Sequence, residues 1–200
     1  MSWIREINYA ESEGKLKKLY NRVKGPEDTI DHVLQVHSLR PHTLDGHMHL
    51  YKSVLHHTEN TLPKYYLELI GCYVSHLNAC DYCFIHHTEG VRKNMPADGN
   101  LDNLIAAITE ESYSASLGPS YAKGLTYVKH LTLHPATIKE SYIEELRMAG
   151  LTDGEILEIN QVASYFNYVN RTVLGLGVQL EKTNIGMSPS SDSDNNWNHA

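Results

Sequence analysis

The sequence predicts an all-α fold, a helical bundle, and three observations carry that prediction. Apolar residues recur at i, i+3, i+4 and i+7 along most of the chain, which places them on one face of an α-helix. Segments with this spacing are separated by breaks rich in Pro, Gly and Asn. No segment shows a convincing alternation of apolar and polar residues, the pattern of a half-buried β-strand. We therefore expect one helical domain over residues 1–185 and a tail over residues 186–200 that is too polar to fold alone.

The first half of the chain contains five predicted helices. The first has an apolar stripe that runs from Leu16 to Val23, and the third opens at Pro41, since a proline is tolerated in a first helical turn. The fourth begins just after Pro63 and stops near Asn78. It is apolar nearly all round, which is typical of a helix at the centre of a bundle. In chain order the predicted ranges are 12–23, 31–38, 41–55, 64–78 and 79–91.

The second half follows a linker over residues 93–99 and contains four predicted helices. Gly150 is expected to end the third of them, because only glycine takes the left-handed conformation without penalty. Thr152 and Glu155 have the spacing of a capping box, which predicts the start of a long final helix. The predicted ranges are 101–110, 125–133, 138–148 and 155–180.

Composition narrows the classes of protein. The 200 residues are 41% hydrophobic and 20% charged, as in a soluble globular protein, and the formal net charge of -7 argues against a nucleic-acid binder. No apolar run approaches the roughly 20 residues of a membrane helix. The first residues are charged where a signal peptide would be apolar. We therefore expect a cytoplasmic protein, in which a C-x-x-C pair indicates redox or metal chemistry rather than a structural disulfide.

The stretch HLNACDYCFIHHTEG combines two thiols with an imidazole. Asn78 is a good N-cap, so Cys80 is expected in the first turn of a helix, where the dipole favours a thiolate. Cys80, Cys83 and His87 are then spaced i, i+3 and i+7 on one helical face. His87 lies one turn beyond Cys83 and is placed to accept its proton. A sulfenic acid on one sulfur can condense with the other to form a disulfide.

Glu68 is a candidate fourth member of this site. It interrupts the apolar stripe of the preceding helix, where a buried carboxylate requires a partner. A tight connection near residues 78–80 would fold that face back toward His87. The alternative interpretation is a surface glutamate near the start of a helix.

These residues resemble a known family, the alkyl hydroperoxidase D-like branch of the carboxymuconolactone decarboxylase superfamily, and within it the peroxidase-related enzymes. The family pattern is a Glu, eleven residues and Cys-x-x-Cys-x-x-x-His, which this chain matches at Glu68, Cys80, Cys83 and His87. The stretches IREINYAESEGKLKKLY and YFNYVNRTVLGLGVQLE also resemble the ends of that subgroup. The resemblance implies a peroxiredoxin-like alkyl hydroperoxidase with Cys83 as the peroxidatic thiol and Cys80 as the resolving thiol. Glu68 and His87 would relay protons.

The resemblance also implies the partners of the protein. They are a small hydroperoxide, a dithiol reductant such as a lipoylated protein, and further copies of the chain in a dimer, trimer or hexamer. No cofactor, metal, nucleic acid or membrane is expected. One residue departs from the family: Tyr82 stands where well-studied members carry a His, and a phenol of pKa near 10 cannot act as a base at neutral pH.

Two other interpretations remain open. A zinc site would use both thiols and His87 with Glu68 or His86, although no second ligand pair at the usual spacing occurs. A non-catalytic helical oligomeric module would leave the thiols as bystanders. His86 is expected at a pocket wall or against a neighbouring subunit, and Cys72 is expected to be an ordinary buried cysteine.

Overall fold

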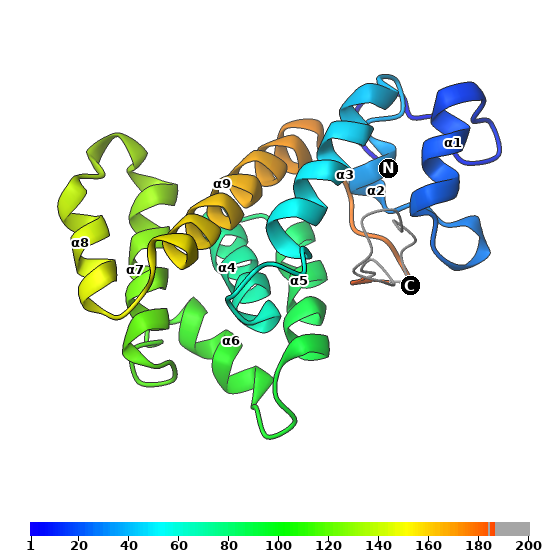
Figure 1. The fold of residues 1–200 in the computed structure, drawn as a ribbon. Coiled ribbons are helices and arrows are strands. Elements are labelled where there is room, and N and C mark those ends of the chain that lie inside the picture. The colour runs from blue at the N-terminus through cyan, green and yellow to red at the C-terminus, as the bar shows by residue number, and fades with distance from the viewer. Residues whose placement is uncertain (184, 187–200) are drawn as a thin grey trace.

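The computed structural model describes residues 1–183 and 185–186, and its regular elements in that part of the chain are all helices (Figure 1). The predicted all-α class is confirmed. None of the helices in these residues is both long and apolar enough to cross a membrane. The predicted tail lies outside the described residues from position 187 onward. The helices are α1 (Gly14–Val23), α2 (His32–Gln35), α3 (Pro41–Leu55), α4 (Lys64–Leu77), α5 (Asp81–Asn94), α6 (Leu101–Thr109), α7 (Pro119–Leu133), α8 (Glu140–Met148) and α9 (Asp153–Leu176), with 3-10 turns at Pro26–Asp28 and Pro135–Thr137.

Helix α4 forms the centre of the bundle, as its all-round apolar sequence predicts. Every residue from Tyr66 to Ser75 is buried, and the helix packs against α5, α7 and α9. Figure 1 shows α9 running diagonally across the bundle, against α4. A side chain at Gly71 would overlap the ring of Phe166, so the glycine allows α9 to approach α4 closely. The remaining helices pack around this α4–α5–α9 unit.

The connection between α4 and α5 differs from the prediction. Asn78 was expected to cap α5, but it is the C-cap of α4, and the N-cap of α5 is Cys80. Between them Ala79 has a φ of 54°, in the left-handed region that non-glycine residues rarely adopt. The Cys80 amide donates to the Ser75 carbonyl at 2.8 Å, which closes this tight turn. Cys83 therefore lies in the first turn of α5.

Helix α7 begins six residues before the predicted start at Leu125. Pro119 occupies its first turn, where its missing N–H leaves no helical bond unmade. A proline in the first turn also marks the start of α3 at Pro41, so Pro119 was the available sequence signal for α7. The capping box of Thr152 and Glu155 is confirmed, and Gly150 has the predicted left-handed conformation with a φ of 96°, one residue after the C-cap of α8.

Helix α9 ends at Leu176, four residues before the predicted end. Gly177 turns left-handed with a φ of 63°, and the Val178 amide donates to the Val173 carbonyl at 3.0 Å. This pattern is a helix-ending motif that releases the chain in a new direction. The following residues run beside the N-terminal segment, where the Gln179 amide donates to the Met1 carbonyl at 3.0 Å.

Replacing Gly177 by Ala is predicted to destabilise the protein. An L-residue in the left-handed conformation costs about 1–2 kcal/mol, and the added carbon would overlap the indole of Trp3. Gly175→Ala is the matched control, because the helical Gly175 has open space around it, and there the change should stabilise by about 0.5–1 kcal/mol. Urea unfolding of both variants measures the difference. Equal stabilities of the two variants would contradict this account of the helix end.

Candidate active site

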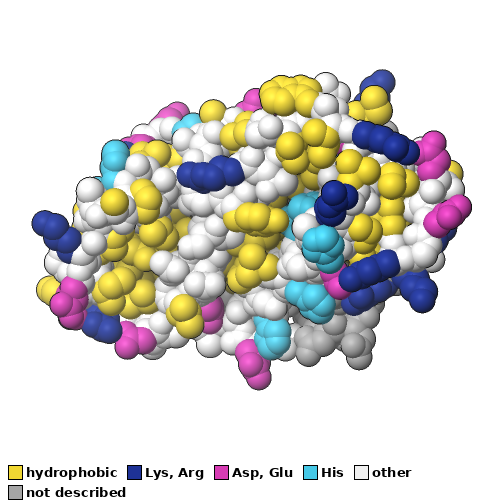
Figure 2. Space-filling model, turned by 90° about the horizontal axis from the view of Figure 1, so that it is seen from above, with side chains coloured by type: hydrophobic (Ala, Val, Ile, Leu, Met, Phe, Trp, Pro, Cys, Tyr) yellow, Lys and Arg dark blue, Asp and Glu magenta, His cyan; other side chains and the backbone are white. Residues whose placement is uncertain are grey.

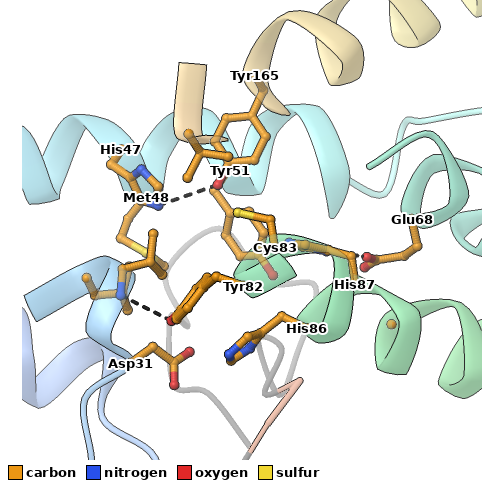
Figure 3. Close-up of a pocket in the computed structure, with 14 residues that line it drawn as sticks. Asp31, His47, Met48, Tyr51, Glu68, Tyr82, Cys83, His86, His87 and Tyr165 are labelled. Atoms are coloured by element: carbon orange, nitrogen blue, oxygen red, sulfur yellow. Dashed lines mark hydrogen bonds and ion pairs between the residues drawn. The ribbon is translucent and has the colours of Figure 1, made fainter. Parts of the chain in front are cut away.

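A small cavity opens between the N-terminal turn of α5 and helices α3, α4 and α9 (Figure 3). Its volume is about 50 Å³, enough for a few water-sized molecules. Polar and sulfur-bearing side chains share its walls with aliphatic and aromatic ones. The lining residues are Asp31, Val33, Leu34, His47, Met48, Tyr51, Glu68, Tyr82, Cys83, His86, His87, Gly90, Tyr165 and Val169.

The two thiols of the C-x-x-C motif contact each other but open to different sides. Both are buried, Cys80 at 1% exposure and Cys83 at 3%, and both are reduced. Cys83 lines the cavity, whereas Cys80 borders a shallow hollow together with Trp3 and Leu174. Cys80 leaves the helical face because, as the N-cap, it has a non-helical backbone with a φ of -101° and a ψ of 84°. The prediction that Cys80, Cys83 and His87 share one helical face is therefore wrong for Cys80.

A hydrogen bond between the thiols decides how they ionise. The Cys83 S–H stabilises a thiolate on Cys80 and so lowers the pKa of Cys80. The same bond raises the pKa of Cys83 well above its usual value, and burial raises it further. The pair therefore releases one proton readily and holds the second strongly. This behaviour suits a site that needs one thiolate beside one thiol.

Glu68 lies against His87 in the same cavity. Its carboxylate is 2% exposed and accepts a hydrogen bond of 2.6 Å from His87 Nδ1. His56 Nε2 lies 4.0 Å from the other carboxylate oxygen. The carboxylate packs over Gly90, where any added side chain would collide with it. This contact agrees with the prediction that the connection after α4 brings Glu68 to His87.

The Glu68 contact fixes the protonation pattern of the His87 ring. An ionised carboxylate has only acceptors, so Nδ1 must carry the hydrogen, and Nε2 is left to exchange protons elsewhere. The edge of the ring packs against Phe166 at 4.5 Å between centroids, which holds its orientation. In Figure 3 Cys83, His87 and Glu68 follow one another along the inner wall. The cavity thus brings together a thiol, an imidazole and a carboxylate.

A second buried carboxylate, Glu181, was not predicted as a site residue. Its oxygens accept hydrogen bonds from Tyr82 Oη at 2.7 Å, His86 Nε2 at 2.8 Å and the His32 amide at 2.5 Å. Burial raises the pKa of Glu181, but the bonds from His86, Tyr82 and the His32 amide outweigh it and lower the pKa to about 2. Glu181 was not expected at the site because the apolar spacing predicts a last helix that continues to residue 180. The glycine at position 177 was the available signal.

Tyr82 takes a structural part in this arrangement. Its hydroxyl accepts from the Val33 amide at 3.2 Å and its ring stacks on His86 at 4.5 Å. Burial raises the pKa of Tyr82, so the phenol is no base at neutral pH. His86 lines the cavity wall, one of the two placements expected for it. Tyr82 therefore ties the start of α5 to α2 and to the segment after α9.

The third cysteine lies apart from these groups. Cys72 is fully buried in α4 and contacts Thr88 Oγ1 at 3.8 Å, and burial raises the pKa of its thiol strongly. This is the environment of an unreactive structural cysteine, as expected. Within residues 1–183 and 185–186, no three His, Cys, Asp or Glu side chains are grouped so that they could hold a metal ion.

Comparisons with known proteins identify the fold. No protein-family model and no curated protein sequence matches the chain. Among solved structures, an uncharacterized peroxidase-related protein from Silicibacter sp. TM1040 is 26% identical with a TM-score of 0.67, covering 75% of this chain and 76% of that one. A second such protein, from Ralstonia eutropha JMP134, is described as an alkylhydroperoxidase AhpD core. It is 18% identical with a TM-score of 0.77 over 90% of this chain and 93% of that one.

A third neighbour carries a different activity in its name. The debrominase Bmp8, solved with 2,3,4-tribromopyrrole, is 15% identical with a TM-score of 0.63, covering 84% of this chain and 82% of that one. At this identity the likeness shows a shared fold. The chain has the AhpD-like helical fold of the peroxidase-related proteins, and the predicted resemblance to the alkyl hydroperoxidase D-like branch is confirmed.

Replacing Glu181 by Gln is predicted to remove a pH-dependent contribution to stability. The folded pKa of about 2 lies below the ordinary value of 4.5 for a glutamate, so the carboxylate stabilises the fold above pH 4.5 and loses this effect as the pH falls toward 2. The shift corresponds to about 3 kcal/mol. Urea unfolding of wild type and Glu181→Gln at pH values between 2.5 and 7 should give a difference that is largest at neutral pH and shrinks in acid.

The exposed Glu59 provides the control for this experiment, since Glu59→Gln should leave stability nearly unchanged at every pH. A Glu181→Gln difference that stays constant from neutral pH to acid would contradict the proposed role of the carboxylate.

Proposed function

We propose that the protein is a thiol-dependent peroxidase, a peroxiredoxin-like alkyl hydroperoxidase that oxidises Cys83 and Cys80 to a disulfide. The observation that carries this proposal is the hydrogen-bonded thiol pair at the start of α5, with the Glu68–His87 pair in the cavity that Cys83 lines. A peroxidatic cysteine needs a thiolate and an acid for the departing oxygen, and this cavity supplies groups for both.

In the proposed cycle Cys83 attacks first, because it is the thiol that lines the cavity. The proton shared along the thiol pair moves to Cys80 as the Cys83 sulfur bonds to the terminal peroxide oxygen. The O–O bond breaks, and the departing alkoxide takes a proton from His87. Glu68 stabilises the charged imidazole through its bond to Nδ1. The products are an alcohol and a sulfenic acid on Cys83.

The second step closes the disulfide. The Cys80 sulfur attacks the Cys83 sulfur, and hydroxide leaves with a proton as water. Overall, two thiols and one hydroperoxide give one disulfide, one alcohol and one water. An external dithiol, such as a lipoylated protein, then reopens the bond. Access to Cys80 comes from the hollow beside Trp3 and Leu174, so peroxide and reductant would approach from different sides.

The debrominase neighbour suggests a second activity for the same dithiol. Reductive debromination would also oxidise two thiols to a disulfide, while a carbon–bromine bond is replaced by a carbon–hydrogen bond and bromide leaves. The cavity volume of about 50 Å³ favours a compact peroxide over a brominated ring. Assays with hydrogen peroxide, an alkyl hydroperoxide and a bromopyrrole compare the two activities directly.

An oligomer is part of the proposal. Several large hydrophobic side chains on α3 and α9 are exposed, and Figure 2 shows hydrophobic groups spread over one face of the molecule. Such a surface suits contacts between copies of the chain. The exposed large hydrophobic residues on these two helices are Leu50, Leu157, Tyr168 and Leu174.

Cysteine variants test the chemistry. Cys83→Ser should abolish the consumption of peroxide, whereas Cys80→Ser should reduce one equivalent and stop with a sulfenic acid, detectable by mass spectrometry after dimedone labelling. Cys72→Ser is the matched control and should retain activity, because Cys72 lies apart from the cavity. Metal analysis of the same samples addresses the zinc alternative. Full peroxidase activity in Cys83→Ser would refute the mechanism.

Glu68→Gln tests the proton relay while it keeps the shape of the side chain. A glutamine cannot stabilise a charged His87, so kcat/KM for peroxide should fall by more than about tenfold. The folded state is checked by circular dichroism. Glu158→Gln, which alters a carboxylate bonded to the Thr61 and Leu62 amides, is the control. An unchanged kcat/KM in Glu68→Gln would show that the relay has no part in the reaction.

A further inference from the structure

Asn170 is a buried amide that contacts both sulfurs and that neither the sequence motif nor the proposed cycle includes. It lies on α9, is 0% exposed, and its side chain lies within reach of both Cys80 and Cys83. An amide can present either its N–H group or its oxygen to a sulfur, with opposite effects on a thiolate. The orientation of the amide therefore decides what Asn170 does.

The orientation follows from a chain of hydrogen bonds that starts at Asn167. Its Nδ2 donates to the Ala163 carbonyl at 3.0 Å, and a carbonyl can only accept. Its Oδ1 accepts from the Arg171 guanidinium at 2.8 Å, and a guanidinium can only donate. Both ends of the Asn167 amide are thus fixed by partners that have a single role.

The next amide, Asn78, must match this polarity. It presents Nδ2 to Asn167 Oδ1 at 3.1 Å, and the same nitrogen donates to Asn170 at 3.0 Å. The atom of Asn170 that receives this bond is therefore Oδ1. The Nδ2 of Asn170 faces the opposite way, where it donates to Ser75 Oγ at 3.1 Å. One N–H of Nδ2 serves Ser75, and the second remains for the sulfurs.

Ser75 connects this amide to the turn that carries the motif. Its carbonyl accepts the Cys80 amide at 2.8 Å, and its side chain is fully buried. The Asn170 amide and the Cys80 backbone are thereby held against the same residue. A buried amide that is turned round would leave its N–H group unpaired, which is costly away from water.

We propose that Asn170 is the residue that stabilises the thiolate of the dithiol, by donating an N–H from Nδ2 to the sulfurs. Asn167 and Asn78 are positioning residues that hold this amide in the donating orientation. The inference rests on the proposed function only in taking the dithiol as the reactive pair. It adds a group from α9 to a motif that otherwise comes from α4 and α5.

The experiment is a pH titration of thiolate absorbance at about 240 nm, with the titration of a Cys80→Ser/Cys83→Ser protein subtracted to remove the tyrosine signal. Asn170→Asp replaces the donor by an acceptor. A charge-assisted hydrogen bond of usual strength implies that the thiolate fraction at neutral pH falls about tenfold. Thermal melting confirms that each variant is folded.

A second variant acts without touching the sulfurs. In Asn78→Asp the new carboxylate has only acceptors, so Asn170 must turn its Nδ2 toward position 78. Its Oδ1 then faces the thiols, which should also lower the thiolate fraction. Asn160→Asp is the matched control, because Asn160 lies on α9, is half-buried and donates to Tyr127 Oη at 2.7 Å. It should leave the thiol titration unchanged.

The results separate this inference from the peroxidase proposal, because the titration contains no peroxide. An unchanged titration in folded Asn170→Asp, or the same shift in Asn160→Asp, would overturn the role of Asn170 even in an active peroxidase. If Asn170→Asp does not fold, an unchanged titration in Asn78→Asp overturns it instead. The inference is supported if the thiolate fraction falls in Asn170→Asp and in Asn78→Asp but not in Asn160→Asp. This holds even if the protein reduces no peroxide.

Discussion

The site depends on the buried contact between Glu68 and His87. A carboxylate that is 2% exposed is unfavourable unless charged or hydrogen-bonded groups surround it, and here the His87 ring meets it at 2.6 Å. The contact requires α4 and α5 to lie side by side, with Gly90 opposite the carboxylate and Phe166 against the ring. The local packing of three helices is thus arranged around one hydrogen-bonded pair, and the cavity lies beside it.

The turn between α4 and α5 couples this contact to the thiols. Ala79 takes a left-handed conformation, and the bond from Cys80 to Ser75 pulls the chain back onto α4. As a result Cys83 enters the first turn of α5, near the positive end of the helix dipole. Cys80 remains outside the helix on another face. This geometry allows two thiols three residues apart to contact each other while they open to different surroundings.

A second carboxylate plays a comparable part at the other side of α5. Glu181 binds Tyr82, His86 and the start of α2, and so joins the segment after α9 to the motif. Tyr82, which departs from the family's usual histidine, is occupied by this contact. The position thus holds a structural tie in place of an imidazole, while Glu68 and His87 line the same cavity as Cys83.

The sequence alone determined the helical class, the central place of α4, the Thr152 capping box and the residues of the motif, because these depend on periodicity and spacing within single helices. Only the tertiary structure decided that Cys80 is an N-cap, that Glu181 reaches the site and that Asn170 faces the sulfurs. Each of these depends on where the chain leaves a helix, at Ala79 and Gly177, and on which distant amide or carboxylate then becomes a neighbour. The spacing of hydrophobic residues indicates which side of a helix is buried, but it does not indicate which residues pack against that side.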